Sequence, residues 1–166
     1  MALINENLLE FKYKKLSPEG MAPQKNPGDV GWDLKCIEDE NFKVLYNGPF
    51  GNREPEKCVE LEPGERYGFK TGIAIQLPEG YHAVIKPRSG LAIKHGVEIL
   101  AGIIDNSYSG EIIICLKNGG NSPIRISPKD KIAQMLIFKE NEGYFTEVYE
   151  LRSTDRGDKG FGSTGK

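Results

Sequence analysis

Long apolar stretches and paired cysteines are both missing from this 166-residue sequence. No window approaches the ~18 apolar residues of a membrane-spanning helix, and the N-terminal segment has neither the apolar core nor the cleavage site of a secretory signal. Cys36, Cys58 and Cys115 are odd in number and show no C-x-x-C spacing, so they support neither a disulfide framework nor a zinc site. The sequence therefore predicts no membrane partner and a cytoplasmic location, which means the host cytoplasm if the source is viral.

An excess of one charge is also missing. The 22 basic and 24 acidic residues are interspersed and give a formal net charge of −2. A chain of this kind has no evident basic face for a nucleic-acid polymer, so we expect no nucleic-acid partner. A small anion held by a few arginines stays open.

Helical periodicity is rare, and only "SGLAIKHG", residues 89–96, resembles a short helix. Twenty glycines and ten prolines instead divide the chain every eight to twelve residues into short strand candidates such as "YHAVIKP" and "EIIICLKN". In "FKTGIAIQL" the apolar pattern has period two, which puts five residues on one face: Phe69, Thr71, Ile73, Ile75 and Leu77. The pattern predicts an all-β fold, a jelly-roll-like β-barrel or sandwich of short strands.

The length predicts a single domain. We expect the barrel to span residues 1–155, with residues 46–58 as an inserted surface loop because they hold two glycines, two prolines and four charges. Residues 156–166, "RGDKGFGSTGK", contain four glycines and one large apolar residue, so they cannot bury a face as a strand or helix. They are predicted to form a flexible C-terminal arm.

The end of this arm also matches seven of the eight positions of a phosphate-binding P-loop. A P-loop needs a following Ser or Thr for magnesium and a helix whose first amides face the phosphate. With no residue after Lys166 in this sequence, we do not expect a P-loop. The arm suits either a flap that closes over a nucleotide or a frayed polar tail. Its polar and stacking groups are Arg156, Phe161, Ser163 and Thr164.

Two segments carry candidate functional residues next to turn signals. "AGIIDNSYSGEI" places Asp105 and Tyr108 in a polar turn between strands, where the aspartate is either a turn former or a catalytic carboxylate. "KPRSGLA" places Arg88 and Ser89 between a strand-ending proline and a possible helix, where Ser89 is either an N-cap or part of an anion site.

Two further segments hold polar residues near apolar strands. "GDVGWDL" puts Asp29 and Asp33 near glycines, either in a turn or with a carboxylate facing a cleft. "KDKIAQMLIF" puts Lys131 and Gln134 on a core strand, where a solvated lysine and a hydrogen-bonded glutamine are the default.

Taken together, five segments resemble the five motifs of the trimeric dUTP pyrophosphatases (dUTPases), from about Leu9 to Lys166. They are "GDVGWDL", "PRSGLA", "GIIDNSYSGE", "KIAQM" and "RGDKGFGSTG". The resemblance implies a jelly-roll-like β-barrel, a homotrimer with sites shared between subunits, and hydrolysis of dUTP to dUMP and pyrophosphate with Mg²⁺ carried on the triphosphate. That reaction keeps uracil out of DNA and supplies dUMP for dTMP synthesis.

The resemblance also implies roles for individual residues. Asp105 is similar to the general base that activates the attacking water, with Gln134 near the water and the phosphates. Asp33 is similar to the carboxylate that meets the metal through its water shell. The implied substrate-binding residues are Arg88, Ser89, Gly90, Gly102, Ile103, Tyr108, Gly110, Arg156, Phe161, Gly162, Ser163 and Thr164.

Within that set, the resemblance implies that main-chain groups around Gly102, Ile103 and Gly110 pair with the uracil edge. Tyr108 would pack against the sugar and exclude a 2′-hydroxyl, and Phe161 would stack on the base as the arm closes.

Three positions depart from the family pattern: Ser109 replaces a common arginine, Lys131 replaces another, and Trp32 replaces a tyrosine. Lysine keeps the charge of arginine but loses its two-pronged geometry.

Two other functions stay open at this point. A dCTP deaminase resembles this fold but would want a glutamate base in place of Asp105. A nucleotide-sensing regulatory protein would use the same pocket to control a partner protein.

Overall fold

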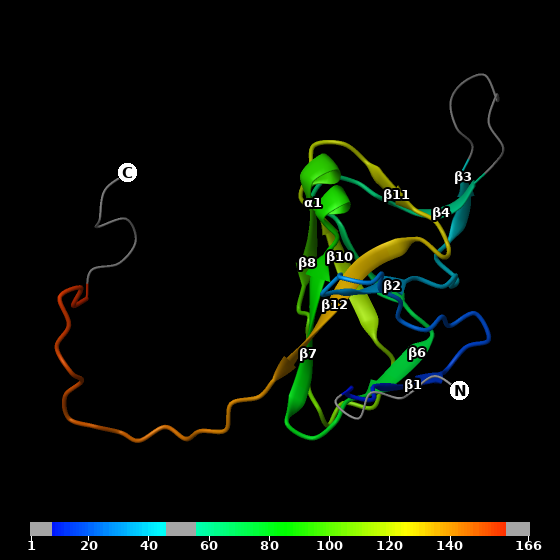
Figure 1. Ribbon diagram of the computed structural model, residues 1–166. Coiled ribbons are helices and arrows are strands. Elements are labelled where there is room, and N and C mark those ends of the chain that lie inside the picture. The colour runs from blue at the N-terminus through cyan, green and yellow to red at the C-terminus, as the bar shows by residue number, and fades with distance from the viewer. Residues whose placement is uncertain (1–7, 46–55, 159–166) are drawn as a thin grey trace.

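The computed structural model describes residues 8–45 and 56–158 (Figure 1). Over these residues the chain forms twelve β-strands and one short α-helix, α1 (Ser89–His95). The strands, in chain order, are β1 (Lys12–Lys15), β2 (Trp32–Lys35), β3 (Lys43–Leu45), β4 (Glu56–Leu61), β5 (Arg66–Lys70), β6 (Ile73–Gln76), β7 (Tyr81–Pro87), β8 (Val97–Leu100), β9 (Ile103–Ile104), β10 (Ile113–Asn118), β11 (Ile124–Ile126) and β12 (Lys131–Lys139).

The strands pair into antiparallel sheets around one core (Figure 1). The largest sheet has the order β2-β12-β7-β9, and a three-stranded sheet has the order β5-β10-β8. A second three-stranded sheet, β11-β4-β3, and the pair β1-β6 complete the described part of the chain. Short antiparallel strands of this kind confirm the predicted all-β, jelly-roll-like fold.

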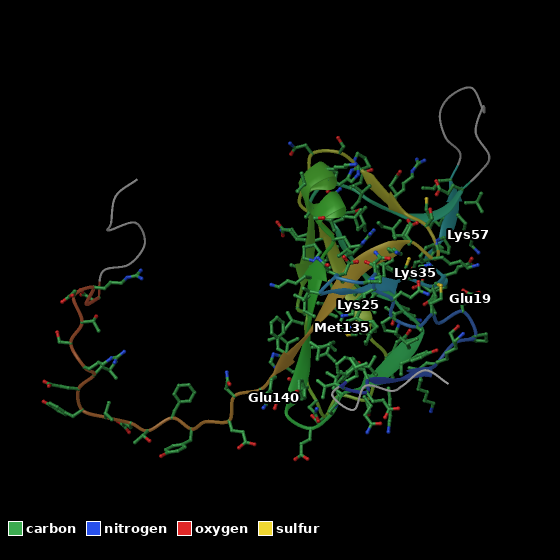
Figure 2. The ribbon with its side chains drawn as sticks, in the orientation of Figure 1. Glu19, Lys25, Lys35, Lys57, Met135 and Glu140 are labelled. Carbon is green, nitrogen blue, oxygen red and sulfur yellow. The ribbon has the colours of Figure 1, made fainter. Side chains whose placement is uncertain are left out.

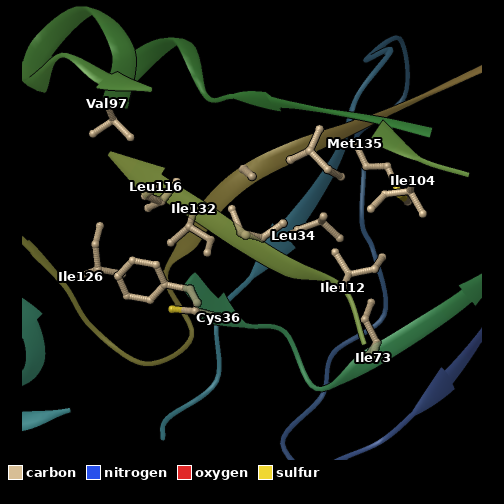
Figure 3. Packing of buried hydrophobic residues seen from close by; sticks show 14 of the residues in the cluster. Leu34, Cys36, Ile73, Val97, Ile104, Ile112, Leu116, Ile126, Ile132 and Met135 are labelled. Carbon is tan, nitrogen blue, oxygen red and sulfur yellow. The ribbon is translucent and has the colours of Figure 1, made fainter. Parts of the chain in front are cut away.

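Aliphatic and aromatic side chains from these sheets fill the core (Figure 3). Phe69 of β5, Leu34 of β2 and Ile132 of β12 are each at most 1% exposed. Burial of each such side chain stabilises the fold by about 1.5–3 kcal/mol. Phe69 also meets Phe42 and Tyr67 edge-on, with ring centroids 6.2 and 4.8 Å away. The core thus supports the sheets on which the motif residues lie.

The period-two segment "FKTGIAIQL" buries all five predicted residues but does not form one strand. β5 ends at Lys70 and β6 begins at Ile73, and the two strands belong to different sheets. Gly72 makes the bend with a φ of +68°, and its carbonyl oxygen accepts the amide of Leu16 at 2.8 Å. Thr71 stays buried because its hydroxyl donates to the carbonyl of Ile112 at 2.7 Å.

The surface loop predicted for residues 46–58 differs from the structure at its end. Residues 56–58 belong to β4, where Cys58 is buried and lies opposite Lys43. Residues 46–55 lie outside the described residues. Among the other cysteines, Cys36 is buried and Cys115 is half-buried; all three are free thiols.

The segment after β12 leaves the body of the molecule (Figure 1). Residues 140–158 are exposed throughout and form no strand. The departure begins after Glu140, whose amide still donates to the carbonyl of Gly80 at 2.7 Å, and so well before the boundary at residue 156 that the sequence predicted. Its apolar side chains, such as Tyr144 and Phe145, are exposed and are not covered by other described residues. Separately, the one helix in the described residues is too short to cross a membrane.

Candidate active site

Strand β7 joins two groups of motif residues. Near its start, Ala83 pairs with Ile104 of β9, which leads directly into Asp105. Beyond its end, Arg88 begins the phosphate-side motif. At ~3.3 Å per residue, the five residues from 83 to 88 separate the Asp105 end of the hairpin from Arg88 by about 17 Å along the strand.

The hairpin group is shaped by its backbone. Gly102 has a φ of +114°, and its carbonyl accepts the amide of Ile85 at 2.7 Å. A Cβ added to Gly102 would lie 3.0 Å from the carbonyl oxygen of Ile85. The preceding Ala101 also has a positive φ, of 62°, which costs energy for a residue with a side chain. The strand thus turns sharply just before the predicted uracil-binding positions, leaving Ile103 70% exposed.

Asn106 anchors the turn that carries Asp105. Its side-chain amide donates to the carbonyls of Pro78 and Tyr81 at 2.7 and 2.9 Å. The carbonyl of Asp105 accepts the amide of Tyr108 at 3.0 Å, which closes the turn. The Asp105 carboxylate itself is exposed and makes no hydrogen bond or ion pair with the described part of the chain. A carboxylate held on a fixed turn but left unpaired is suited to accept a proton.

Tyr108 lies directly over Gly110. Its hydroxyl donates to the carbonyl of Glu111 at 2.8 Å, and a Cβ at Gly110 would lie 2.6 Å from that hydroxyl oxygen. Gly110 is therefore required by the position of the ring. A pocket of about 190 Å³ lies beside the ring, lined by Gly102, Asp105 and neighbouring residues. This pocket thus brings together four of the sequence-predicted residues: Gly102, Ile103, Asp105 and Tyr108.

The phosphate-side group centres on Asp33 of β2. Its carboxylate accepts Arg88 Nε at 3.1 Å on one oxygen and Lys131 Nζ at 2.8 Å on the other, and the side chain is only 19% exposed. Arg88 Nη1 also donates to the Lys131 carbonyl at 3.4 Å. Both carboxylate oxygens of Asp33 are thus engaged by cations, and Asp33 holds the Arg88 guanidinium in place.

Gln134 of β12 lies opposite Asp33 in the sheet. Its Nε2 donates to the Pro87 carbonyl at 3.1 Å, beside the Arg88 backbone. A Cβ at Gly31 would lie 2.6 Å from Gln134 Oε1, so a side chain at Gly31 would displace the amide. The structure therefore brings together Asp33, Arg88 and Gln134, three of the site residues that the family resemblance implied.

Ser89 and Gly90 form the first turn of α1. Arg88 is the N-cap residue, with φ −73° and ψ 136°, and no side chain caps the helix. Ser89 is therefore not the N-cap that one interpretation of the sequence allowed. Both residues are exposed, and the first backbone amides of a helix have no partner within it.

A protein-made metal cage is not seen in the described residues, which contain no group of three or more His, Cys, Asp or Glu side chains able to hold an ion. Arg156 lies on an exposed turn of the departing segment. Phe161, Gly162, Ser163 and Thr164 lie outside the described residues.

Three features of the site were missed in the sequence. The pairing of Lys131 with Asp33, the space that Gly31 leaves for Gln134, and the anchoring by Asn106 all join residues far apart in the chain. Only Gly31 carried a local signal, a glycine within an otherwise apolar strand entry. The Trp32 ring meets Phe11 edge-on at 6.1 Å, and Trp32 lines a hollow that also includes Asp33 and Lys131.

An antiparallel β-barrel with a glycine-shaped hairpin pocket and a separate cation cluster is a protein suited to hold a small anionic ligand. A sequence model of the dUTPase family matches residues 56–165, and the chain belongs to that family, whose members are hydrolases of nucleotide metabolism.

Individual relatives of known name agree with this family assignment. The deoxyuridine 5′-triphosphate nucleotidohydrolase of Nautilia profundicola is 38% identical over 161 residues, covering 95% of this chain and all of the relative. The enzyme of the same name from Hydrogenobaculum sp. is 41% identical over 160 residues, covering 95% of this chain and 99% of the relative. The solved dUTPase of Staphylococcus bacteriophage 80alpha with dUPNHPP has a TM-score of 0.76 and 27% identity, covering 95% of this chain and 99% of that one.

Proposed function

We propose that this protein hydrolyses dUTP to dUMP and pyrophosphate. The observation that carries the proposal is the joint presence of the hairpin pocket with an unpaired Asp105 and of the Asp33–Arg88–Gln134 cluster. The relatives named above support it, because their names state the same reaction. The reaction would keep uracil out of DNA and supply dUMP.

In the proposed mechanism, Asp105 accepts a proton from the water that attacks the α-phosphorus. Proton acceptance requires the carboxylate within about 2.6–3.2 Å of the water, which suits a side chain on an anchored turn. The bond from the α-phosphorus to the bridging oxygen breaks, and pyrophosphate leaves with the electron pair. Gln134, with its amide fixed by Pro87, would orient the water and phosphates.

Arg88 and the amides of Ser89 and Gly90 would stabilise the negative charge that builds on the leaving pyrophosphate. Arg88 suits this role because Asp33 fixes its Nε and leaves other guanidinium donors available. Arg156 and the arm residues Phe161, Gly162, Ser163 and Thr164 would close over the bound nucleotide.

Mg²⁺ fits this site as an ion carried by the triphosphate. The described residues offer no protein cage for it, and the Asp33 carboxylate already binds two cations, so Asp33 would reach the ion only through water. When bound, the ion would offset the negative charge of the phosphates.

Base selection would rest on the hairpin. The sharp turn at Gly102 exposes main-chain groups to the uracil edge next to Ile103, and Gly110 allows Tyr108 to lie flat beside the sugar. Close packing of this kind would exclude the thymine methyl group and the ribose 2′-hydroxyl.

The two halves of each site would come from different chains of a homotrimer. Within one chain they lie about 17 Å apart along β7, too far for Asp105 and Arg88 to act on the same phosphate chain from one subunit. The departing segment 140–158 would carry the arm to a third subunit (Figure 1). A cytoplasmic location is part of the same proposal and agrees with three free thiols.

Pyrophosphate release measured in parallel from dUTP, dTTP, dCTP and UTP, with and without Mg²⁺, tests the function. We expect turnover of dUTP alone, dependent on Mg²⁺. Ammonia release from dCTP would instead indicate a deaminase. Tight dUTP binding without turnover would favour a regulatory sensor, a role suggested by the description of the phage 80alpha dUTPase as controlling transfer of virulence genes.

A further inference from the structure

Four polar side chains line up across the largest sheet. Gln134 of β12 lies opposite Asp33 of β2 on one side and opposite Lys86 of β7 on the other. An isolated bridge adds Gln24 opposite Asp33. Residues that face each other across antiparallel strands point to the same side of the sheet. Gln24, Asp33, Gln134 and Lys86 therefore form one row, which we call the polar row.

The polar row lies on the outer side of the sheet. Its neighbours one residue along, Leu34 and Ala133, are buried at 1% and 0% exposure. Because side chains alternate along a strand, Asp33, Gln134 and Lys86 must face outward. Lys86 is accordingly exposed.

Arg88 lies on the same side as Lys86. The chain remains extended at Arg88, with φ −73° and ψ 136°, so residues two apart keep the same orientation. Adjacent strands are ~4.8 Å apart, which puts Lys86 about 10 Å from Asp33 across the row and about 7 Å from Arg88 along β7. A triphosphate held by Arg88 would pass within reach of the flexible Lys86 side chain.

Lys86 is an uncompensated positive charge of this surface. Asp33 offsets one of the two positive charges of Arg88 and Lys131, which leaves that cluster with a net charge of +1. Lys86 makes no ion pair or hydrogen bond with the described part of the chain, so together with Asp33, Arg88 and Lys131 it gives a net charge of +2. A free ammonium beside a cationic anion site attracts phosphate without first breaking another contact.

We propose that Lys86 is a further substrate-binding residue, which contacts the triphosphate together with Arg88. The inference rests on the proposed function and adds a specific contact to it. Lys86 acts as a mobile point charge, whereas Arg88 is held in a fixed orientation by Asp33. Its contribution is expected in affinity for the phosphates and not in the proton transfer at Asp105.

The test compares Lys86→Met with Lys139→Met. Lys139 is an exposed lysine of β12, opposite Tyr81, in the same sheet but five residues from Gln134. The Lys139→Met substitution therefore removes the same charge at a position outside the polar row. Binding of dUPNHPP with Mg²⁺ and of deoxyuridine is measured by calorimetry, and KM and kcat are measured for dUTP. Circular dichroism checks folding. Lys86→Gln serves as a second variant that removes the charge of Lys86.

We expect Lys86→Met to weaken dUPNHPP binding and raise the KM for dUTP about five- to tenfold, with kcat within twofold and deoxyuridine binding unchanged. The difference should shrink at about 0.5 M salt, because screening weakens exposed charges. Lys86→Arg should restore binding to within twofold, and Lys139→Met should match the unmodified protein.

Equal binding by the Lys86→Met and Lys139→Met variants would overturn the inference, whether both match the unmodified protein or both are weaker. The proposed function can fail separately. An unmodified protein that binds dUPNHPP but releases no pyrophosphate from dUTP would refute the reaction, while the binding comparison would still decide the role of Lys86.

Discussion

The hairpin and the polar row meet β7 on its two edges, through β9 and through β12, and are built in different ways. The hairpin depends on backbone shape: a positive φ at Gly102, contact between Tyr108 and Gly110, and anchoring by Asn106. The polar row depends on side-chain charge carried by antiparallel strands, whose β12–β2 pairing shifts register between Lys131 and Ala133. Figure 2 labels Met135 on β12, the strand that also carries Gln134.

The comparison teaches which changes each region tolerates. A pocket formed by backbone contacts is damaged by an added methyl group, even when charge is unchanged. A charged surface on regular strands keeps its shape after substitution but loses affinity when a charge is removed. Hairpin variants should therefore alter chemistry and selectivity, and row variants should alter phosphate affinity.

The largest effect is expected at Asp105. Asp105→Asn should lower kcat for dUTP by ~10² to 10⁴ and leave dUPNHPP affinity within a few-fold, because the amide cannot accept the proton of water. The matched control is Asp29→Asn in an exposed turn, which should keep full activity. Substantial turnover by Asp105→Asn, measured by pyrophosphate release, would remove the residue from the mechanism.

A similarly large effect is expected from deleting residues 156–166, which should leave a folded trimer with almost no activity. Mixed with Asp105→Asn subunits, unfolded and refolded together, this variant should regain activity, because some sites combine an intact Asp105 from one chain with an intact arm from another. Light scattering checks the trimer, and mass spectrometry checks subunit exchange. Exchanged but inactive mixtures would show that both parts act within one chain.

An intermediate effect is expected from shape changes in the hairpin. Gly110→Ala should lower kcat/KM for dUTP about tenfold, since its Cβ would lie 2.6 Å from the Tyr108 hydroxyl and displace the ring. Tyr108→Ala should narrow the preference for dUTP over UTP. Gly143→Ala is the control, because its added Cβ meets nothing within 4 Å. An unchanged dUTP to UTP ratio would locate sugar selection elsewhere.

A smaller effect is expected at Asp33. Asp33→Asn should raise the KM for dUTP about fivefold by freeing Arg88 and Lys131, while the free energy of unfolding changes by only about 1 kcal/mol for a partly exposed pair. Glu98→Gln, which breaks the exposed pair with Lys117, controls for general charge loss. A loss of kcat without a change in KM would contradict the positioning role.

The smallest effect on either region is expected from alkaline pH, which acts on groups outside both. Burial raises the pKa of the Cys36 thiol from 9.0 to about 12, and burial with a hydrogen bond to Asp39 raises the pKa of Tyr67 from 10.0 to about 12. Because the folded pKa values are the higher ones, this stabilisation is complete below about pH 9 and is lost as the pH rises toward 12.

The melting temperature should accordingly fall between pH 9 and 12, and Tyr67→Phe should make the fall shallower. At pH 7 to 8 this variant should keep the kcat/KM of the unmodified protein. If the melting temperature of the variant falls with pH as steeply as that of the unmodified protein, Tyr67 does not contribute to the loss of stability at alkaline pH.

Much of the fold followed from local pattern. Twenty glycines and ten prolines between short β-branched segments predicted an all-β fold, and "SGLAIKHG" predicted the one helix in the described residues. The bend at Gly72 was not predicted, because alternating burial continues through it while the chain passes from one sheet to another. The end of the inserted loop was misplaced for a similar reason: charges near Cys58 hid a buried strand.

The sequence by itself determined the strand pattern and the order of the motif residues, since both depend on neighbours in the chain. Only the tertiary structure decided that Asp33 binds Arg88 and Lys131 at once, and that Lys86 joins the same row as Gln134. These contacts join residues roughly 50 to 100 positions apart, and a shift of one residue in strand register would turn each of them to the other face of the sheet. Register is set by how the whole core packs, which no single segment of the sequence specifies.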